Sequence, residues 1–177
     1  MTNEEKALLD MISFAEGTLG ISNDGYDVIV GYKVIQGWTT DTTIKHGHTL
    51  WYNKSANSTA AGRYQFTYDT WIRLNSNRNV PMTKLTQNIS GVKLINEKLV
   101  GFDKSKFTNY NIFIQATDKL ATVWASIPLS RDIIDSKGRI HKAGKSYYAG
   151  DGVNSSRVTL GELHDVYMSA LNIYKNM

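Results

Sequence analysis

The chain has 177 residues, enough for one domain with a hydrophobic core and short for two. A content of 41% apolar and 11% aromatic residues is typical of a globular protein, and a formal charge of +4 falls well short of a nucleic-acid-binding surface. Because the chain contains no cysteine, disulfides, thiol nucleophiles and thiolate metal sites are excluded.

The first predicted helix ends beside a carboxylate. Thr2 and Glu5 have the spacing of a capping box. Apolar residues recur at helical spacing at Ala7, Leu8, Met11, Ile12 and Ala15. Glu16 lies at the edge of this apolar stripe, and Gly17 suits a helix C-terminus.

A carboxylate in this position has two reasons to stay protonated near neutral pH. The negative end of the helix dipole and partial burial both raise its pKa. Glu16 is therefore a candidate general acid of the kind that protonates a glycosidic oxygen. The alternative is an ordinary boundary residue paired with a lysine.

The later elements are mainly helical. Residues 25–38 are rich in β-branched and aromatic residues and predict a short hairpin, and the polar residues 39–59 predict a loop or flap. Further helices are predicted at residues 67–75, 86–100 and 111–126, and from the capping pair Thr159 and Glu162 onward. Residues 129–156 are turn-rich. The sequence predicts one mainly helical α+β domain over residues 1–177, with a small antiparallel sheet after the first helix.

The segment "STAAGRYQ", residues 58–65, has the composition of a sugar-binding motif. Its small residues let backbone approach a ligand, while Tyr64 and Gln65 supply an aromatic face and an amide that both donates and accepts hydrogen bonds. The alternative is that Arg63 and Tyr64 anchor the start of a helix.

Asp27 is the main candidate for a second catalytic carboxylate, with Asp24 and Asp41 as competitors. Alternatively, Asp27 caps backbone or holds a basic side chain. Among the tryptophans, Trp51 is the best candidate for stacking on a sugar, whereas spacing places Trp124 mainly in the core. His46 and His48 lack the further ligands that a metal site requires, so no metal is predicted.

Four segments, "ALLDMISFAEGT", "GYDVIVG", "STAAGRYQF" and "VWASIP", follow one another between Ala7 and Pro128. Their order and intervals resemble those of bacteriophage lambda-type endolysins, which are soluble lytic transglycosylases. The resemblance implies a lysozyme-like fold that cleaves the β-1,4 bond between N-acetylmuramic acid and N-acetylglucosamine. It also implies that Glu16 acts first as acid to the leaving oxygen and then as base to the muramyl 6-hydroxyl, leaving a 1,6-anhydro end without a metal or other cofactor.

The resemblance further implies contacts between the glycan strand and a set of side chains near Glu16. The predicted substrate-binding residues are Ser58, Tyr64, Gln65, Asp27 and Trp51. We expect peptidoglycan as the partner, no nucleic acid, no membrane insertion and a monomer.

The beginning of the chain, "MTNEEKALLD", carries charges where a signal peptide has its apolar region. We therefore expect synthesis in the host cytoplasm, and action on periplasmic peptidoglycan that depends on a holin to open the inner membrane. Three other functions compete. A hydrolytic muramidase would use a second carboxylate such as Asp27. A zinc amidase would need a set of metal ligands that four scattered histidines barely supply. A wall-binding or virion protein would not need Glu16.

Overall fold

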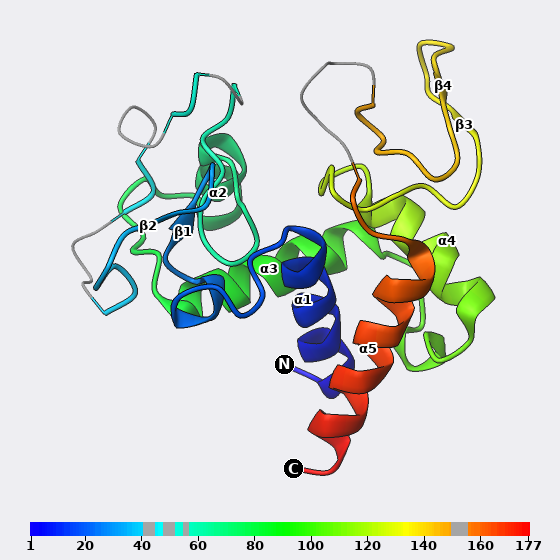
Figure 1. Cartoon of the computed structure of the whole chain (residues 1–177), viewed down its shortest axis with the longest axis horizontal. Helices are drawn as coiled ribbons and strands as arrows, with labels where there is room; N and C mark the ends of the chain where they lie inside the picture. The colour runs from blue at the N-terminus through cyan, green and yellow to red at the C-terminus, as the bar shows by residue number, and fades with distance from the viewer. Residues whose placement is uncertain (41–44, 48–51, 55–56, 150–155) are drawn as a thin grey trace. The chain divides into compact units, whose positions relative to one another are not determined.

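The computed structural model describes residues 1–40, 45–47, 52–54, 57–149 and 156–177. The chain folds into two compact units (Figure 1), and the single domain over residues 1–177 stays a prediction. Residues 1–15 and 95–177 form the bundle unit, and residues 16–94 form the sheet unit. Helix α3 (Lys84–Lys98) begins in the sheet unit and ends in the bundle unit. No helix in the described ranges is both long and apolar enough to cross a membrane.

The bundle unit is organised around its first and last helices. Helices α1 (Asn3–Ala15) and α5 (Leu160–Lys175) pack side by side, as the blue and orange-red ribbons of Figure 1 show. Both predicted capping boxes are present. Thr2 N donates to Glu5 Oε2 at 2.9 Å, and Thr159 N donates to Glu162 Oε2 at 2.7 Å. These caps satisfy backbone groups that a helix start leaves without partners.

Helix α4 (Tyr110–Leu120) is shorter than predicted. The sequence placed its end near Ser126, whereas the chain turns after Leu120. Thr122 and Val123 are consecutive β-branched residues with low helix propensity, and Thr122 Oγ1 donates to Lys119 O at 2.7 Å. Trp124 is still buried beyond the helix, so its prediction as a core residue is confirmed.

The turn-rich segment after Pro128 contains a hairpin that the sequence did not predict. Strands β3 (Ile133–Ile134) and β4 (Ile140–His141) are antiparallel, with Ile133 opposite His141 and Ile134 opposite Ile140. Each strand is two residues long, too short for a periodic pattern to reveal. The structure therefore has two small sheets among its described residues, not one.

The sheet unit contains the predicted hairpin. Strands β1 (Val28–Ile29) and β2 (Lys33–Val34) are antiparallel, with Val28 opposite Val34. The other edge of β1 pairs with the "STAAGRYQ" segment, because Val30 N donates to Ala60 O at 2.8 Å and Gly62 N donates to Val28 O at 2.7 Å. The predicted hairpin is confirmed, and its central strand connects it to the motif.

Two further helices supply core residues of the sheet unit. Helix α2 (Tyr68–Asn75) begins after the N-cap Thr67 and buries Trp71, whose ring centre lies 5.6 Å from that of Phe66. In α3, Gln87 and Ser90 are buried, whereas Ile89 is 57% exposed. Gln87 is buried because its amide bonds backbone groups that would otherwise lack partners.

Candidate functional site

Glu16 is the first residue after α1 and is half-buried. The next residue, Gly17, has a φ of +70°, as expected for a glycine that ends a helix. Tyr32, in the turn between β1 and β2, donates its hydroxyl to Glu16 O at 3.5 Å. A Cβ on Gly17 would lie 3.0 Å from that hydroxyl, so the glycine also makes room for the tyrosine. The turn of the hairpin therefore contacts the backbone that carries Glu16.

The residues after Glu16 are attached to the "STAAGRYQ" segment. The buried Thr18 donates its hydroxyl to Arg63 O at 2.5 Å. Gly25 has a φ of +80°, and a Cβ there would lie 2.6 Å from Thr18 O. Only glycine fits such a close approach without displacing backbone. Two independent contacts thus fix the position of the chain just beyond the candidate acid.

Arg63 is the centre of this attachment. Its guanidinium is buried, forms an ion pair with the Asp24 carboxylate and donates to Asp24 O at 3.1 Å. The guanidinium carbon also lies 5.1 Å from the centre of the Tyr26 ring, within reach of a cation–π contact. Arg63 therefore anchors the residues between Glu16 and β1, and the start of α2 is capped by Thr67 instead.

Asp27 lies inside the sheet unit and not on its surface. It is 4% exposed, and its Oδ2 accepts a hydrogen bond from Ser22 Oγ at 3.2 Å. Its Oδ1 is buried and has no hydrogen-bond partner in the part of the chain that the structure describes. The predicted direct contact of Asp27 with the glycan does not fit this burial. Asp24 is the partner of Arg63, and Asp41 lies outside the described residues.

The "STAAGRYQ" residues separate into core and surface positions. Tyr64 is 1% exposed, and its hydroxyl donates to Asn88 Oδ1 at 2.6 Å. This burial does not favour the predicted stacking of its ring on a sugar, which stays a prediction. The ring instead packs edge-on against Phe66. Gln65 and Ser58 are both partly exposed and stay candidates for glycan contact.

The side chain of Gln65 keeps an oxygen atom that can accept a hydrogen bond from a ligand. Its backbone φ is +47°, and its Nε2 donates to Gly62 O at 2.9 Å and to Val28 O at 3.4 Å. Both bonds use the amide nitrogen, which leaves the amide oxygen able to accept from a ligand hydroxyl. Ser58 Oγ accepts from Ala60 N at 3.1 Å and keeps its own proton to donate.

The remaining aromatic and histidine candidates are mostly internal. Trp38 and Trp71 are buried, while Trp51 and His48 lie outside the described residues. His46 is buried with its Nε2 2.7 Å from Phe66 O. Over the described ranges, no three His, Asp or Glu side chains are grouped as metal ligands.

Three residues that organise the site were not identified from the sequence: Thr18, Tyr32 and Gln87. Their partners are distant along the chain, so no local pattern marks them.

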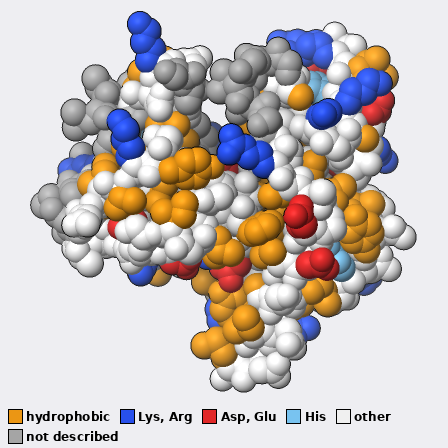
Figure 2. Space-filling view, in the orientation of Figure 1, with side chains coloured by type: hydrophobic (Ala, Val, Ile, Leu, Met, Phe, Trp, Pro, Cys, Tyr) orange, Lys and Arg blue, Asp and Glu red, His pale blue; other side chains and the backbone are white. Residues whose placement is uncertain are grey.

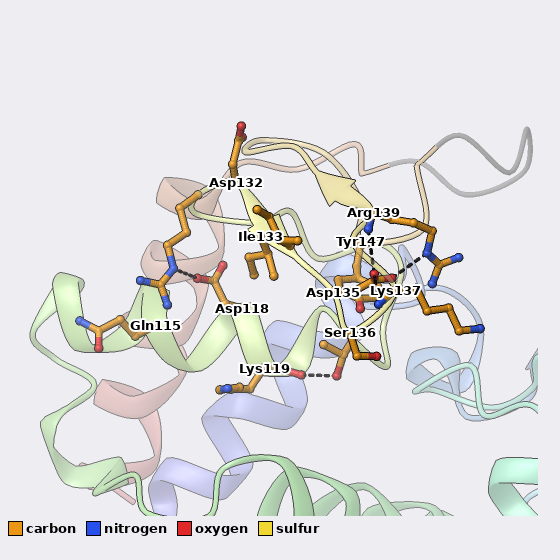
Figure 3. Close-up of a pocket in the computed structure, with 13 residues that line it drawn as sticks. Gln115, Asp118, Lys119, Asp132, Ile133, Asp135, Ser136, Lys137, Arg139 and Tyr147 are labelled. Atoms are coloured by element: carbon orange, nitrogen blue, oxygen red, sulfur yellow. Dashed lines mark hydrogen bonds and ion pairs between the residues drawn. The ribbon is translucent and has the colours of Figure 1, made fainter.

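A pocket of about 570 Å³ lies elsewhere, in the bundle unit between α4 and the β3–β4 hairpin (Figure 3). None of the predicted site residues lines it.

Comparisons with known proteins give consistent results. The family model described as Endolysin matches residues 6–153. The endolysin of Escherichia phage lambda is 30% identical over 135 residues, covering 72% of this chain and 79% of that protein. The endolysin of Escherichia phage P2 is 30% identical over 132 residues, covering 69% of this chain and 78% of that protein.

Two solved structures share the fold. Bacteriophage lambda lysozyme complexed with a chitohexasaccharide matches with a TM-score of 0.61 and 24% identity, covering 96% of this chain and 95% of the other. A second structure of lysozyme from bacteriophage lambda matches with a TM-score of 0.56 and 22% identity, covering 98% and 95%. The predicted α+β lysozyme-like fold class is confirmed.

Proposed function

The chain belongs to the endolysin family, and from this premise we propose that it is a peptidoglycan lytic transglycosylase. As an endolysin it is a peptidoglycan-degrading enzyme of host lysis. In the proposed reaction Glu16 donates a proton to the glycosidic oxygen between N-acetylmuramic acid and N-acetylglucosamine. Its carboxylate then takes the proton of the muramyl 6-hydroxyl, whose oxygen attacks the anomeric carbon and closes a 1,6-anhydro ring.

The observation that best supports Glu16 is the way its backbone is fixed. Tyr32 contacts Glu16 O, and Thr18 bonds Arg63 O two residues further along. A general acid must be held in position relative to the bond it cleaves, and rigid attachment of its backbone supplies this. The lambda lysozyme structure with a bound chitohexasaccharide supports a β-1,4-linked glycan as the substrate.

The burial of Asp27 supports transglycosylation over hydrolysis. A two-carboxylate hydrolase needs its second carboxylate on the sugar, either as nucleophile or to activate water. Asp27 is enclosed, and Asp24 is held by Arg63. A transglycosylase needs neither, because the muramyl 6-hydroxyl is already tethered to the reacting sugar. A muramidase that uses Asp27 is the alternative reaction.

Product analysis tests the reaction type. Purified peptidoglycan is digested, and the muropeptides are weighed by mass spectrometry before and after borohydride treatment. We expect ends that are lighter than hydrolysed ends by one water and that borohydride does not reduce, from the native protein and from Asp27→Asn alike. Predominantly reducible muramic ends, with a folded but inactive Asp27→Asn variant, would establish the muramidase instead.

The role of Glu16 is tested by Glu16→Gln, which preserves size and removes the transferable proton. We expect a folded protein whose wall-clearing rate falls about a hundredfold to ten-thousandfold, the usual contribution of general acid-base catalysis. Glu97→Gln makes the same change at an exposed position of α3 and should clear walls at the native rate. Native clearing by the folded Glu16→Gln protein would remove Glu16 from the mechanism.

The proposal extends to the setting of the reaction. We infer a monomer that acts on the glycan strands of periplasmic peptidoglycan after a holin has opened the inner membrane. Size-exclusion chromatography with light scattering tests the monomer. Expression in a bacterial host should cause lysis only when a holin is co-expressed or the inner membrane is permeabilised, and lysis without either would contradict holin dependence.

A further inference from the structure

The pocket in the bundle unit has the size of a small-ligand site. Its volume of about 570 Å³ lies within the usual range for such sites, roughly 300 to 1,000 Å³. Residues of α4, including Asp118 and Lys119, line one part, and residues of the β3–β4 hairpin and its turn, including Asp135 and Arg139, line another (Figure 3). The lining is strongly charged, so the state of each charged group decides what the pocket can bind.

The Asp118 carboxylate is occupied by internal donors. Its Oδ1 accepts from Ser130 N and its Oδ2 accepts from Ser130 Oγ, both at 2.7 Å. Arg131 Nε lies 3.6 Å from the same Oδ2. Asp118 is buried and fixes the loop that leads into β3, so it is not available to a ligand.

The two carboxylates of the hairpin are occupied in the same way. Asp135 Oδ1 accepts from Lys137 N at 2.8 Å and from Arg139 N at 2.9 Å, while its Oδ2 accepts from Arg139 Nε at 2.6 Å. The bond from the Arg139 backbone is the main reason that the pKa of Asp135 lies well below its ordinary value. Asp132 accepts from Lys142 Nζ at 2.7 Å and from Ala143 N at 2.9 Å.

The basic side chains, in contrast, keep donors for a ligand. Among the described residues, the Arg139 side chain donates only through its Nε, and it is 64% exposed. Arg131 is 72% exposed, and its one contact of this kind within the described ranges is the long one with Asp118. Lys119 and Lys137 are exposed, and within the described part of the chain no hydrogen bond or ion pair engages either ammonium group. Figure 2 shows Lys and Arg side chains gathered over this hairpin.

The pocket therefore offers cationic donors but no free carboxylate. Ile133 and the half-buried Tyr147 add apolar surface to the lining. A ligand that fits carries carboxylates together with small apolar groups, and a neutral sugar has no need of several basic side chains. The peptide stems of peptidoglycan have this chemistry, because they combine alanine methyl groups with the free carboxylates of glutamate and a diamino acid.

We propose that the pocket between α4 and the β3–β4 hairpin binds the carboxylate-bearing peptide stem of peptidoglycan. This inference rests on the proposed function, in that the same polymer supplies both the glycan and the stem. The pocket then selects wall that carries peptides, while the chemistry occurs at the glycan bond. Lys119 and Lys137 contribute ligand binding and no catalytic step.

A binding measurement tests the pocket without relying on catalysis. The full-length protein is titrated by calorimetry with the stem tetrapeptide L-Ala-γ-D-Glu-diaminopimelate-D-Ala, and with the same peptide whose carboxylates are converted to carboxamides. We expect saturable binding of the free acid, and about tenfold weaker binding both of the amidated peptide and of the free acid to Lys119→Ala/Lys137→Ala. Lys175→Ala removes one exposed lysine outside the pocket and should bind as the native protein does.

Three results of the titration would overturn the proposal. The first is no binding of the tetrapeptide to the native protein, and the second is equal affinity for the acid and amidated peptides. The third is displacement of the peptide by inorganic phosphate at equal concentration, which would indicate an unselective anion site. Far-ultraviolet circular dichroism and urea unfolding confirm that the double variant is folded.

Kinetics on two substrates separate this inference from the proposed function. We expect a lower KM for intact peptidoglycan than for glycan strands stripped of peptides by an amidase, and we expect the double variant to lose this advantage. If the double variant still shows the full difference in KM between the two substrates, the proposed role of the pocket is wrong. If the native protein cleaves neither polymer, the proposed function fails, and the titration still decides whether the pocket binds the stem.

Discussion

Replacing Gln87 by leucine tests the buried hydrogen bonds that hold the sheet unit together. Gln87 Oε1 accepts from Arg63 N at 2.9 Å, and its Nε2 donates to Met82 O at 2.8 Å and to Tyr26 O at 2.9 Å. Leucine has a similar size but forms none of these bonds. Three backbone groups then lose a partner in a site where the side chain is fully buried.

The expected loss follows from these three groups. Each unsatisfied buried group costs about 1 kcal/mol or more, so the free energy of unfolding should fall by about 3 kcal/mol. With a urea m-value of about 2 kcal/mol/M, the unfolding midpoint should fall by about 1.5 M. Urea unfolding followed by tryptophan fluorescence measures the change, since Trp38 and Trp71 are in the core of the same unit.

Gln36→Leu is the matched control. Gln36 is exposed, so the same chemical change should alter stability by no more than about 0.5 kcal/mol. A Gln87→Leu protein within about 0.5 kcal/mol of the native one would refute the reasoning, because it would mean that water or a rearranged backbone satisfies the three groups at little cost.

Three further predictions concern packing, backbone conformation and pH. Trp124→Ala should lower the free energy of unfolding by about 3 to 5 kcal/mol, because a packed ring is lost. Gln65→Ala should slow wall clearing and lower the melting temperature less than Trp124→Ala does. If both variants lose similar melting temperature and Gln65→Ala clears walls at the native rate, Gln65 is a structural residue. Gly25→Ala should cost about 2 to 4 kcal/mol in urea unfolding, because its Cβ would meet a backbone carbonyl at a positive φ. Gly20→Ala, with a similar φ and no atom within 4 Å of its Cβ, should cost about 1 kcal/mol, and equal costs would contradict the steric argument. Burial opposes the ionisation of Glu5, but its hydrogen bonds outweigh this effect and lower its pKa from 4.5. The ionised Glu5 therefore adds to the free energy of unfolding above that pH, and this stabilisation is lost as the pH falls through the lowered pKa. The stability difference between the native protein and Glu5→Gln, measured by urea unfolding from pH 3 to 7, should shrink on the acid side, and a constant difference would contradict this sign.

Local sequence determined the starts of α1 and α5 and the end of α1. The capping pairs at Thr2 and Thr159 and the apolar stripe of α1 are relations between residues three or four apart, and a helix forms or ends on such relations. Gly17 marks the end of α1 for the same local reason, so the position of Glu16 at that end was correctly predicted. The expected chemistry of Glu16 follows from that position and stays a prediction.

Tertiary structure decided which polar residues are buried and which partners they have. Arg63 pairs with Asp24, 39 residues away, and the hydroxyl of Thr18 reaches a carbonyl 45 residues away. The buried Tyr64 likewise contacts distant residues, Tyr26 and Asn88 of α3. Composition and periodicity describe each segment alone, whereas exposure of a side chain depends on which distant segments cover it. The sequence by itself therefore placed the candidate acid and its motif in order along the chain, and only the packing of distant segments could decide which side chains of that motif are left for a ligand.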